Sequence, residues 1–188
     1  DLHSTSRRQR QMCIRDRNIT QYISEIVDDF NIMNPIDYCN NPTVNLITHR
    51  YYEICKKNNI NFTISIKNAN IDFIKEHDIT ALLDNLLENA VESALMTNEK
   101  FIDFSISTRN SNFVIIKISN SCNKKPKYID GTLVSSKSTS GMHGIGTRSI
   151  KRVVEKYNGN LEMKFDNDTK TFTSVIGINS NLPSNNQS

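Results

Sequence analysis

The chain has 188 residues, of which 37% are hydrophobic and 23% are charged. This length and apolar content predict one folded domain of ordinary size and exclude wholesale disorder. The chain has no run of about 18 apolar residues, the length that a membrane-spanning helix requires. Four cysteines without paired spacing, Cys13, Cys39, Cys55 and Cys122, argue against a disulfide framework and against a zinc site.

The basic excess of the chain comes from its first residues. The net charge is +3, and five arginines lie within residues 1–17. This segment can be back-translated into a transposase-type sequencing adapter, so residues 1–17 resemble a translated adapter and are left out of the fold prediction. Without its five arginines and two aspartates the chain is formally neutral, which predicts no nucleic-acid partner. We therefore expect that native sequence upstream of Asn18 is missing.

Hydrophobic periodicity predicts helices alternating with strands in the rest of the chain. Apolar residues recur every three or four positions in four segments, which predicts helices over 18–33, 43–58, 78–96 and 145–157. Alternating apolar residues predict strands over 61–67, 71–74, 101–108, 113–119, 161–165 and 172–178.

The helix over 78–96 has the strongest pattern. Its predicted buried side consists of Ile79, Leu82, Leu83, Leu86, Leu87, Ala90, Val91, Ala94 and Leu95. Residues 121–142 show no periodicity, which is typical of a functional lid or of a missed element. The element order predicts an α/β two-layer sandwich in which helices cover one face of a mixed sheet of about five strands. An extra helix precedes this domain, which we place at residues 34–182, and residues 183–188 form a polar tail.

Two asparagines stand in the middle of the strongest helix. Asn85 and Asn89 are four residues apart and share a helix face, with Glu92 and Ser93 close by. Amide oxygens can ligate Mg²⁺, and amide nitrogens can hold phosphate oxygens. A solvated polar stripe is the alternative interpretation, since the chain is rich in Asn.

A glycine-rich segment, Gly-Met-His-Gly-Ile-Gly at 141–146, stands where the long connection meets the next predicted helix. Glycines let backbone N–H groups approach an anion, and a helix N-terminus adds partial positive charge. A flexible hinge would explain the same glycines.

Together the two motifs resemble the GHKL ATP-binding domain of bacterial sensor histidine kinases. Residues 82–94 resemble its N box, and residues 143–159 resemble its second glycine box with the helix that follows. Residues 38–60 are similar to the lead-in of the AgrC-like, quorum-sensing branch. The resemblance covers about residues 36–182 and implies the Bergerat fold of GHKL ATPases.

The resemblance implies that the domain binds ATP with Mg²⁺. Asn89 would ligate the metal ion, Asn85 would support the phosphates, and Lys137 in the lid would reach the γ-phosphate. The start of the following helix would receive the phosphate chain, at His143, Gly144, Ile145 and Gly146.

One motif of the family is absent. Its first glycine box, Asp-x-Gly-x-Gly, supplies an acid that binds the adenine amino group, whereas residues 118–122 read Ile-Ser-Asn-Ser-Cys. Asn120 is the candidate substitute, because its side-chain carbonyl can accept the same hydrogen bond.

The resemblance also implies a phosphoacceptor histidine on a dimerisation helix, and none of His49, His77 and His143 has the expected position. We therefore expect the catalytic domain of a truncated sensor histidine kinase, which transfers the ATP γ-phosphoryl to a histidine upstream of Asn18 and then to a response regulator. Residues 18–33 would be a remnant of the dimerisation helices, through which the intact protein forms a homodimer. The domain would be cytoplasmic, in a protein anchored in the bacterial cell membrane.

Two alternatives stay open. The first is a non-catalytic nucleotide-binding or scaffold module, which the missing adenine-reading acid would suit. The second is a stand-alone GHKL serine kinase of the anti-sigma type, which the long lead-in argues against. A gyrase-type or chaperone-type ATPase is disfavoured, because the position of its general base holds Asn85, and an amide cannot take a proton from water.

Overall fold

The structure is a computed structural model that describes residues 38–67, 69–110, 112–126, 128–129, 132–133 and 145–181. All of these residues belong to one compact unit, Asp37–Ser188. Several sequence predictions lie outside the described residues: the adapter-like segment 1–17, the helix over 18–33, the tail 183–188, and Lys137, His143 and Gly144.

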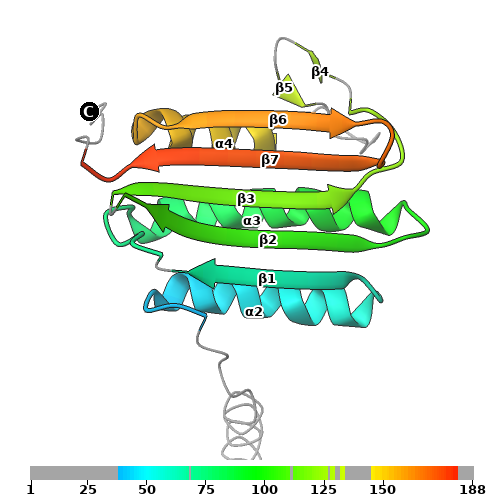
Figure 1. Ribbon diagram of the computed structural model, residues 1–188, viewed down its shortest axis with the longest axis horizontal. Coiled ribbons are helices and arrows are strands. Elements are labelled where there is room, and N and C mark those ends of the chain that lie inside the picture. The colour runs from blue at the N-terminus through cyan, green and yellow to red at the C-terminus, as the bar shows by residue number, and fades with distance from the viewer. Residues whose placement is uncertain are drawn as a thin grey trace, which may run out of the picture. The chain divides into compact units, whose positions relative to one another are not determined.

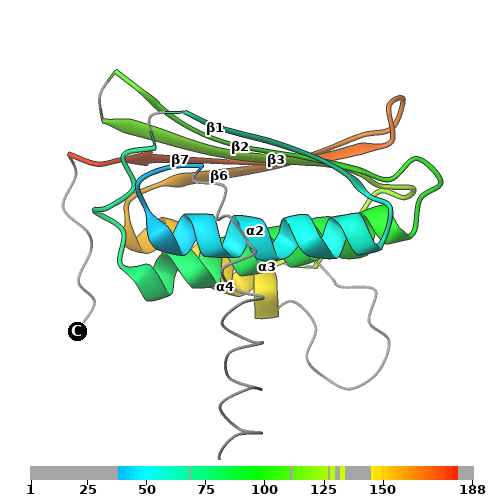
Figure 2. The ribbon, with the colours of Figure 1, turned by 90° about the horizontal axis from the view of Figure 1, so that it is seen from below.

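A five-stranded sheet forms one layer and three helices form the other. The sheet has the strand order β1-β2-β3-β7-β6. Its strands are β1 (Asn61–Lys67), β2 (Phe101–Arg109), β3 (Phe113–Ser121), β6 (Asn160–Asp166) and β7 (Thr171–Asn179). The helices are α2 (Pro42–Lys57), α3 (Glu76–Leu95) and α4 (Ile145–Lys156). Figures 1 and 2 show that all three helices cover the same face of the sheet, which confirms the predicted two-layer α/β sandwich.

The sheet is mixed because β1 runs parallel to β2, whereas the other neighbouring strands are antiparallel. A parallel pair requires a crossover connection, and α3 supplies it between β1 and β2. The sheet joins β3 to β7 directly, with Ile116 opposite Ile176. Strands that are distant in the sequence therefore meet at the centre of the sheet.

The core lies between the two layers (Figure 2), and α3 lies between α2 and α4 (Figure 1). Alternate residues of the central strands face the helices, among them Ile102 and Phe104 of β2 and Ile116 of β3, all at most 1% exposed. The buried side of α3 matches the prediction except at Leu95. Its buried hydrophobic residues are Ile79, Leu82, Leu83, Leu86, Leu87, Ala90, Val91 and Ala94.

Three details of the prediction are wrong. Residues 71–74 form a turn instead of a strand: the Ile74 N–H donates to the Ile71 carbonyl (3.0 Å), and both side chains are buried without a strand partner. Leu95 is 39% exposed because it ends α3 beside Met96, which is 72% exposed. Ser121 belongs to β3, where it pairs with Thr171 of β7, and not to the connection that follows.

The connection after β3 contains a missed element. Two short strands, β4 (Tyr128–Ile129) and β5 (Thr132–Leu133), form a separate antiparallel pair. Strands of two residues are too short to produce a recognisable alternation, which explains why the sequence did not predict them. Most of the rest of this connection lies outside the described residues.

Candidate functional site

The two motif asparagines lie on α3 with different surroundings. Asn85 is half-buried, and its Nδ2 donates a hydrogen bond to the Ala81 carbonyl at 2.6 Å. This bond directs the amide nitrogen into the helix and leaves the oxygen to point elsewhere. Asn89, one turn further along, is exposed and therefore accessible to a ligand. The hydrophobic side of α3 anchors the helix on the sheet and keeps this face away from the core.

The glycine-rich segment meets Asn85 at the start of α4. A Cβ added at Gly146 would lie only 2.8 Å from Asn85 Oδ1, closer than real Cβ contacts. Glycine is thus required for this close approach of α4 to α3. The two motifs, which are about 60 residues apart in the sequence, are brought into contact. Ile145 is the first residue of α4, so the N-terminal end of this helix lies beside the asparagine face.

Asn120 lies near the end of β3 and is 3% exposed. It continues the alternation of Ile116 and Ile118, so it is on the helix-covered face of the sheet. Its Nδ2 donates to the Ser121 carbonyl at 2.9 Å, and Ser93 Oγ of α3 donates to the same carbonyl at 3.0 Å. The Ser121 carbonyl therefore links Asn120 to Ser93 of α3. One N–H of the Asn120 amide is used in this bond, and the amide oxygen is an acceptor.

A second polar cluster joins the beginning of α3 to the end of α4. Asp78 is buried and accepts hydrogen bonds at Oδ2 from Lys156 Nζ and from Tyr157 Oη, both at 2.7 Å. The Tyr157 hydroxyl in turn accepts the Lys75 N–H at 3.0 Å. Phe73 packs edge-on against the Tyr157 ring, with centroids 6.3 Å apart. Sequence reasoning missed this cluster, because nothing local in the sequence links residues so far apart.

The electrostatics of this cluster follow from burial and pairing. Burial raises the pKa of Tyr157 to about 12, and the hydrogen bond and negative charge of Asp78 act in the same direction. For Asp78 burial acts to raise the pKa, but the hydrogen bonds from Lys156 and Tyr157 outweigh it and hold the pKa below its usual range. The pair thus consists of a neutral phenol and an ionised carboxylate at neutral pH.

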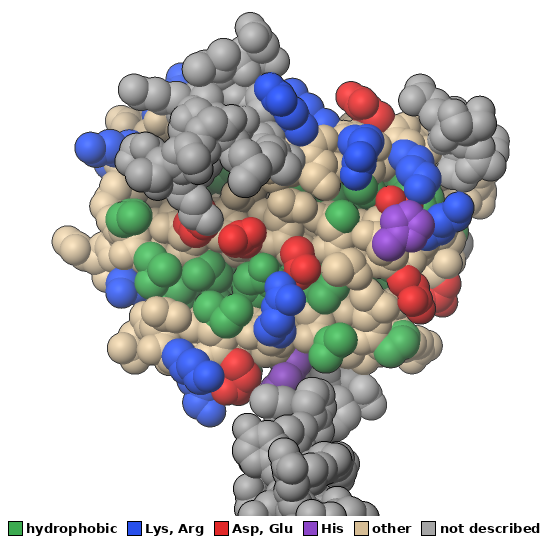
Figure 3. Space-filling model, turned by 180° about the vertical axis from the view of Figure 1, so that it is seen from behind, with side chains coloured by type: hydrophobic (Ala, Val, Ile, Leu, Met, Phe, Trp, Pro, Cys, Tyr) green, Lys and Arg blue, Asp and Glu red, His purple; other side chains and the backbone are tan. Residues whose placement is uncertain are grey.

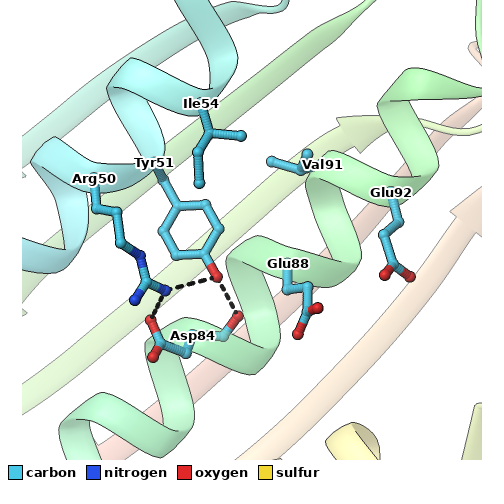
Figure 4. A pocket seen from close by; sticks show the side chains of 7 residues that line it. All are labelled: Arg50, Tyr51, Ile54, Asp84, Glu88, Val91 and Glu92. Atoms are coloured by element: carbon cyan, nitrogen blue, oxygen red, sulfur yellow. Dashed lines mark hydrogen bonds and ion pairs between the residues drawn. The ribbon is translucent and has the colours of Figure 1, made fainter. Parts of the chain in front are cut away.

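A pocket of about 360 Å³ lies between α2 and α3 on the outer side of the helix layer. Figure 4 shows the Tyr51 side chain reaching from α2 toward α3, where its hydroxyl donates to the Asp84 carbonyl at 3.1 Å, and Arg50 pairing with the Asp84 carboxylate at 2.7 Å. Glu88 and Glu92 complete its acidic lining. Three carboxylates against one arginine disfavour an anionic nucleotide here, and the pocket includes none of the predicted site residues.

Acidic and hydrophobic side chains gather beside one another on the helix-covered side of the molecule (Figure 3).

A second pocket, of about 380 Å³, lies on the opposite face of the sheet among the outward-facing residues of β3, β6 and β7. Its lining consists of Lys117, Glu162, Lys164, Asp166, Thr169, Thr171, Thr173 and Val175. None of these residues belongs to either sequence motif.

The two described histidines, His49 and His77, lie on α2 and in the first turn of α3. Both ring nitrogens of His49 are buried without a hydrogen-bond partner among the described residues, and its ring stacks on Tyr52 at 6.4 Å. His77 is exposed, and its Nε2 lies 3.4 Å from Asp78 Oδ1 in the first turn of α3.

The donor set near Asn89 limits what could hold a metal ion. Within the described part of the chain, no three His, Cys, Asp or Glu side chains gather so that they could bind a metal ion. Mg²⁺ that is ligated largely by substrate phosphates needs few protein oxygens, so a single amide such as that of Asn89 fits it.

Comparison with known protein families identifies this arrangement. The sequence profile described as the GHKL domain matches residues 74–178, which is more than half of the chain. The chain belongs to the GHKL domain family. This match includes α3, the β2–β3 hairpin, α4 and the β6–β7 hairpin, and therefore both motifs.

A curated relative and several solved structures agree with this family. A probable C4-dicarboxylate sensor kinase of Bacillus subtilis (strain 168) is 29% identical over 112 residues, which are 56% of this chain and 20% of the relative. The chain thus spans about a fifth of that protein.

None of the helices formed by residues 38–67, 69–110 and 145–181 is long and apolar enough to cross a membrane.

The fold is that of histidine kinase catalytic domains. The catalytic domain of the histidine kinase ThkA matches with a TM-score of 0.57 and 17% identity, over 75% of this chain and 92% of that one. The mycobacterial sensor histidine kinase MprB has a TM-score of 0.53 and 14% identity, over 72% and 95% of the two chains. Acinetobacter baumannii AdeS has a TM-score of 0.53 and 13% identity, over 88% and 82%.

Proposed function

We propose that this chain is the ATP-binding catalytic domain of a sensor histidine kinase, and that it transfers the γ-phosphoryl group of ATP to a histidine on a dimerisation helix. The observation that carries the proposal is the contact between Asn85 and Gly146, which joins the two motifs of the GHKL family at the start of α4. A helix N-terminus with a glycine and a neighbouring amide favours the binding of phosphate oxygens.

In this proposal each motif residue has a distinct task. Asn89 ligates Mg²⁺, which neutralises phosphate charge when it is bound, and Asn85 orients the phosphates. The start of α4 and the segment before it receive the phosphate chain, at His143, Gly144, Ile145 and Gly146. Lys137 contacts the γ-phosphate. Phosphoryl transfer needs mainly positioning and charge neutralisation, which amides, backbone N–H groups and a cation provide.

Asn120 replaces the acid that reads the adenine amino group in this proposal. Its amide nitrogen donates to the Ser121 carbonyl, which favours presenting the side-chain oxygen as an acceptor. An adenine amino group is a donor and matches that oxygen. The substitution of Asn for Asp thus keeps the hydrogen-bond direction without a buried negative charge.

The wider role follows from the same proposal. The phosphoryl group passes from the histidine to a response regulator, and the intact protein is a homodimer of the AgrC-like, quorum-sensing branch that is anchored in the cell membrane. The similarity to a probable C4-dicarboxylate sensor kinase of Bacillus subtilis supports the sensor-kinase part of this proposal. A fragment without the phosphoacceptor helix does not phosphorylate itself.

Titration of a fluorescent ATP analogue tests the proposal directly. The chain is titrated with and without Mg²⁺, beside Asn89→Ala and the matched control Asn160→Ala, which removes an exposed amide from β6. We expect saturable binding that depends on Mg²⁺, is lost in Asn89→Ala and is unchanged in Asn160→Ala. Absence of binding by a chain that melts cooperatively would instead favour the non-catalytic scaffold module.

Transfer to a separate acceptor distinguishes the kinds of kinase. A purified helical hairpin that carries a phosphoacceptor histidine is mixed with the chain and labelled ATP. Acid-labile phosphate on the hairpin supports histidine kinase activity. Acid-stable phosphate on a serine of a partner protein would support the anti-sigma type of kinase instead.

A further inference from the structure

Two polar contacts, one near each end of α4, join α3 to α4. At one end Asp78 accepts hydrogen bonds from Lys156 and Tyr157, and about two turns further along α3 Asn85 meets Gly146. On α4 the same two points are separated by nearly the full length of its 12 residues. The helices are therefore antiparallel, and the end of α4 that touches Asp78 is opposite the end that touches Asn85.

The apolar contacts between these two points restrict the position of α4 along its axis less strictly than directional hydrogen bonds do. Ile150, Val153 and Val154 are at most 2% exposed and determine which face of α4 is turned inward. Hydrophobic burial is non-directional, so it tolerates small sliding of one helix along another. Hydrogen bonds to a buried carboxylate are directional and short, so they set the register.

The chemistry of the Asp78, Lys156 and Tyr157 cluster favours a rigid contact between the two helices. Asp78 lies in the first turn of α3 and Lys156 in the last turn of α4, where an acid and a base are each favoured by the helix dipole. The Tyr157 hydroxyl donates to Asp78 and accepts from the Lys75 N–H, so both of its hydrogen-bonding roles are used. Asp78 and Tyr157 are 7% and 4% exposed, which limits competition from water.

We infer that Asp78, Lys156 and Tyr157 are positioning residues for the nucleotide site: they hold α4 in the register that places Gly146 against Asn85. The inference rests on the proposed function, because the site that they position is the phosphate-binding end of α4. They contact no nucleotide themselves, since they lie at the opposite end of α4 from Gly146. Their effect on binding is transmitted through the helix.

The test compares Asp78→Asn and Tyr157→Phe with the matched control Asp84→Asn. Asp84 lies on the same helix, but its carboxylate pairs with Arg50 of α2 and not with α4. The affinity for Mg²⁺-ATP is measured well below the melting temperature, so that only folded protein is compared. We expect Kd to rise about tenfold in Asp78→Asn, the equivalent of losing one charge-assisted hydrogen bond, and to stay unchanged in Asp84→Asn.

A second measurement, NMR of the free chain, reports on the contact between Gly146 and Asn85 without any nucleotide. In ¹H–¹⁵N spectra of the free chain, the backbone amide signal of Gly146 and the side-chain amide signal of Asn85 should shift in Asp78→Asn and Tyr157→Phe. If Asp78→Asn does not fold, Tyr157→Phe keeps the ring and removes only the hydroxyl, and Lys156→Met removes the charge together with the hydrogen bond to Asp78.

The outcomes separate the two claims. A lower melting temperature with unchanged Kd and unchanged Gly146 and Asn85 signals would mean that the cluster only stabilises the fold, and would overturn the inference. If the wild-type chain binds no ATP, the proposed function fails, and the signals of Gly146 and Asn85 still decide whether the cluster sets the register.

Discussion

Asn85 and Gly146 approach each other so closely that position 146 has no room for a side chain: a Cβ there would lie 2.8 Å from Asn85 Oδ1. Rotation of the Asn85 amide would break the hydrogen bond that its nitrogen donates to the Ala81 carbonyl at 2.6 Å. Any side chain at position 146 therefore displaces Asn85 or separates the two helices.

Gly146→Ala should change binding much more than stability. Gly146 is the second residue of α4, so alanine gains up to about 1 kcal/mol of helix propensity over glycine, which offsets about 1 kcal/mol for the lost hydrogen bond of Asn85. If Asn85 orients the phosphates as proposed, nucleotide affinity should fall about tenfold or more, because the alanine displaces the Asn85 side chain. Urea denaturation and nucleotide titration measure the two effects separately. In Asn85→Ala the same glycine substitution should have little further effect on binding, and a fully additive loss would contradict the proposed contact.

Asn120→Asp should destabilise the fold at neutral pH. A carboxylate cannot donate to the Ser121 carbonyl, and at 3% exposure the lost hydrogen bond should cost about 1–3 kcal/mol. Lowering the pH should restore part of this loss, because a protonated carboxyl group can donate again. The measurement is the urea midpoint at pH 7 and pH 4.5, with Asn160→Asp as the exposed control. Equal stability of the variant and wild type at pH 7 would refute the expected role of the Asn120 amide.

The stability of the fold should depend on Asp78 in acid and on Tyr157 in alkali. The pKa of Asp78 is lowered on folding, so its contribution is present above the usual carboxyl pKa and is lost as the pH falls through the folded value. The pKa of Tyr157 is raised to about 12, so its contribution is present below pH 10 and is lost as the pH rises toward 12.

Urea midpoints across the pH range test this dependence. Asp78→Asn should flatten the acid side of the stability profile, and Tyr157→Phe should flatten its alkaline side. Tyr51 also has a raised pKa, mainly through burial, and contributes a background that Tyr157→Phe leaves in place. Profiles of unchanged shape in both variants would show that the cluster is not linked to folding.

Cys55 should react with thiol reagents far more slowly than Cys39. Burial raises the pKa of Cys55 to about 11, and its side chain is 1% exposed, so little thiolate is present or accessible at pH 8. Cys39 is partly exposed at the start of the described chain. Iodoacetamide labelling followed by peptide mass spectrometry gives both rates. Equal rates would mean that α2 opens readily.

Gly159→Ala should cost more stability than Gly177→Ala. A Cβ at Gly159 would meet the Gly177 carbonyl oxygen at 2.9 Å, which belongs to the backbone of β7 and cannot move independently. A Cβ at Gly177 would meet only the end of the Phe113 ring at 3.0 Å, and Phe113 is a side chain on the surface, 40% exposed, that can shift more easily than backbone. We expect a loss of about 1–3 kcal/mol for Gly159→Ala and a smaller one for Gly177→Ala. Thermal melts of the two variants compare them.

Periodicity predicted the fold because each element has one apolar side of regular spacing. The strand over 61–67 and the helix α3 stand out for this reason. Residues 71–74 misled the prediction, since Ile71 and Ile74 are buried by a turn that no alternation distinguishes from a strand. The sequence pattern gives the apolar side of a segment, and only the three-dimensional contacts give its partner.

The candidate site was predictable where it consists of side chains in motifs, as at Asn85 and Gly146. It was not predictable where a main-chain atom is the common partner, as at the Ser121 carbonyl that receives Ser93 and Asn120. The Asp78–Tyr157 bond was missed for a related reason, because residues almost 80 positions apart in the sequence carry no local signal of contact.

The two borders of the sheet are protected to different degrees against joining another chain. At one border, β6 has Glu162, Lys164 and Asp166 at alternate positions, and such charges discourage edge-to-edge association. At the other border, the corresponding exposed positions of β1 carry uncharged Thr63 and Ser65, and only Lys67 is charged. Self-association of the concentrated protein should therefore begin along β1, and a lysine at position 63 or 65 is the natural way to improve its solubility.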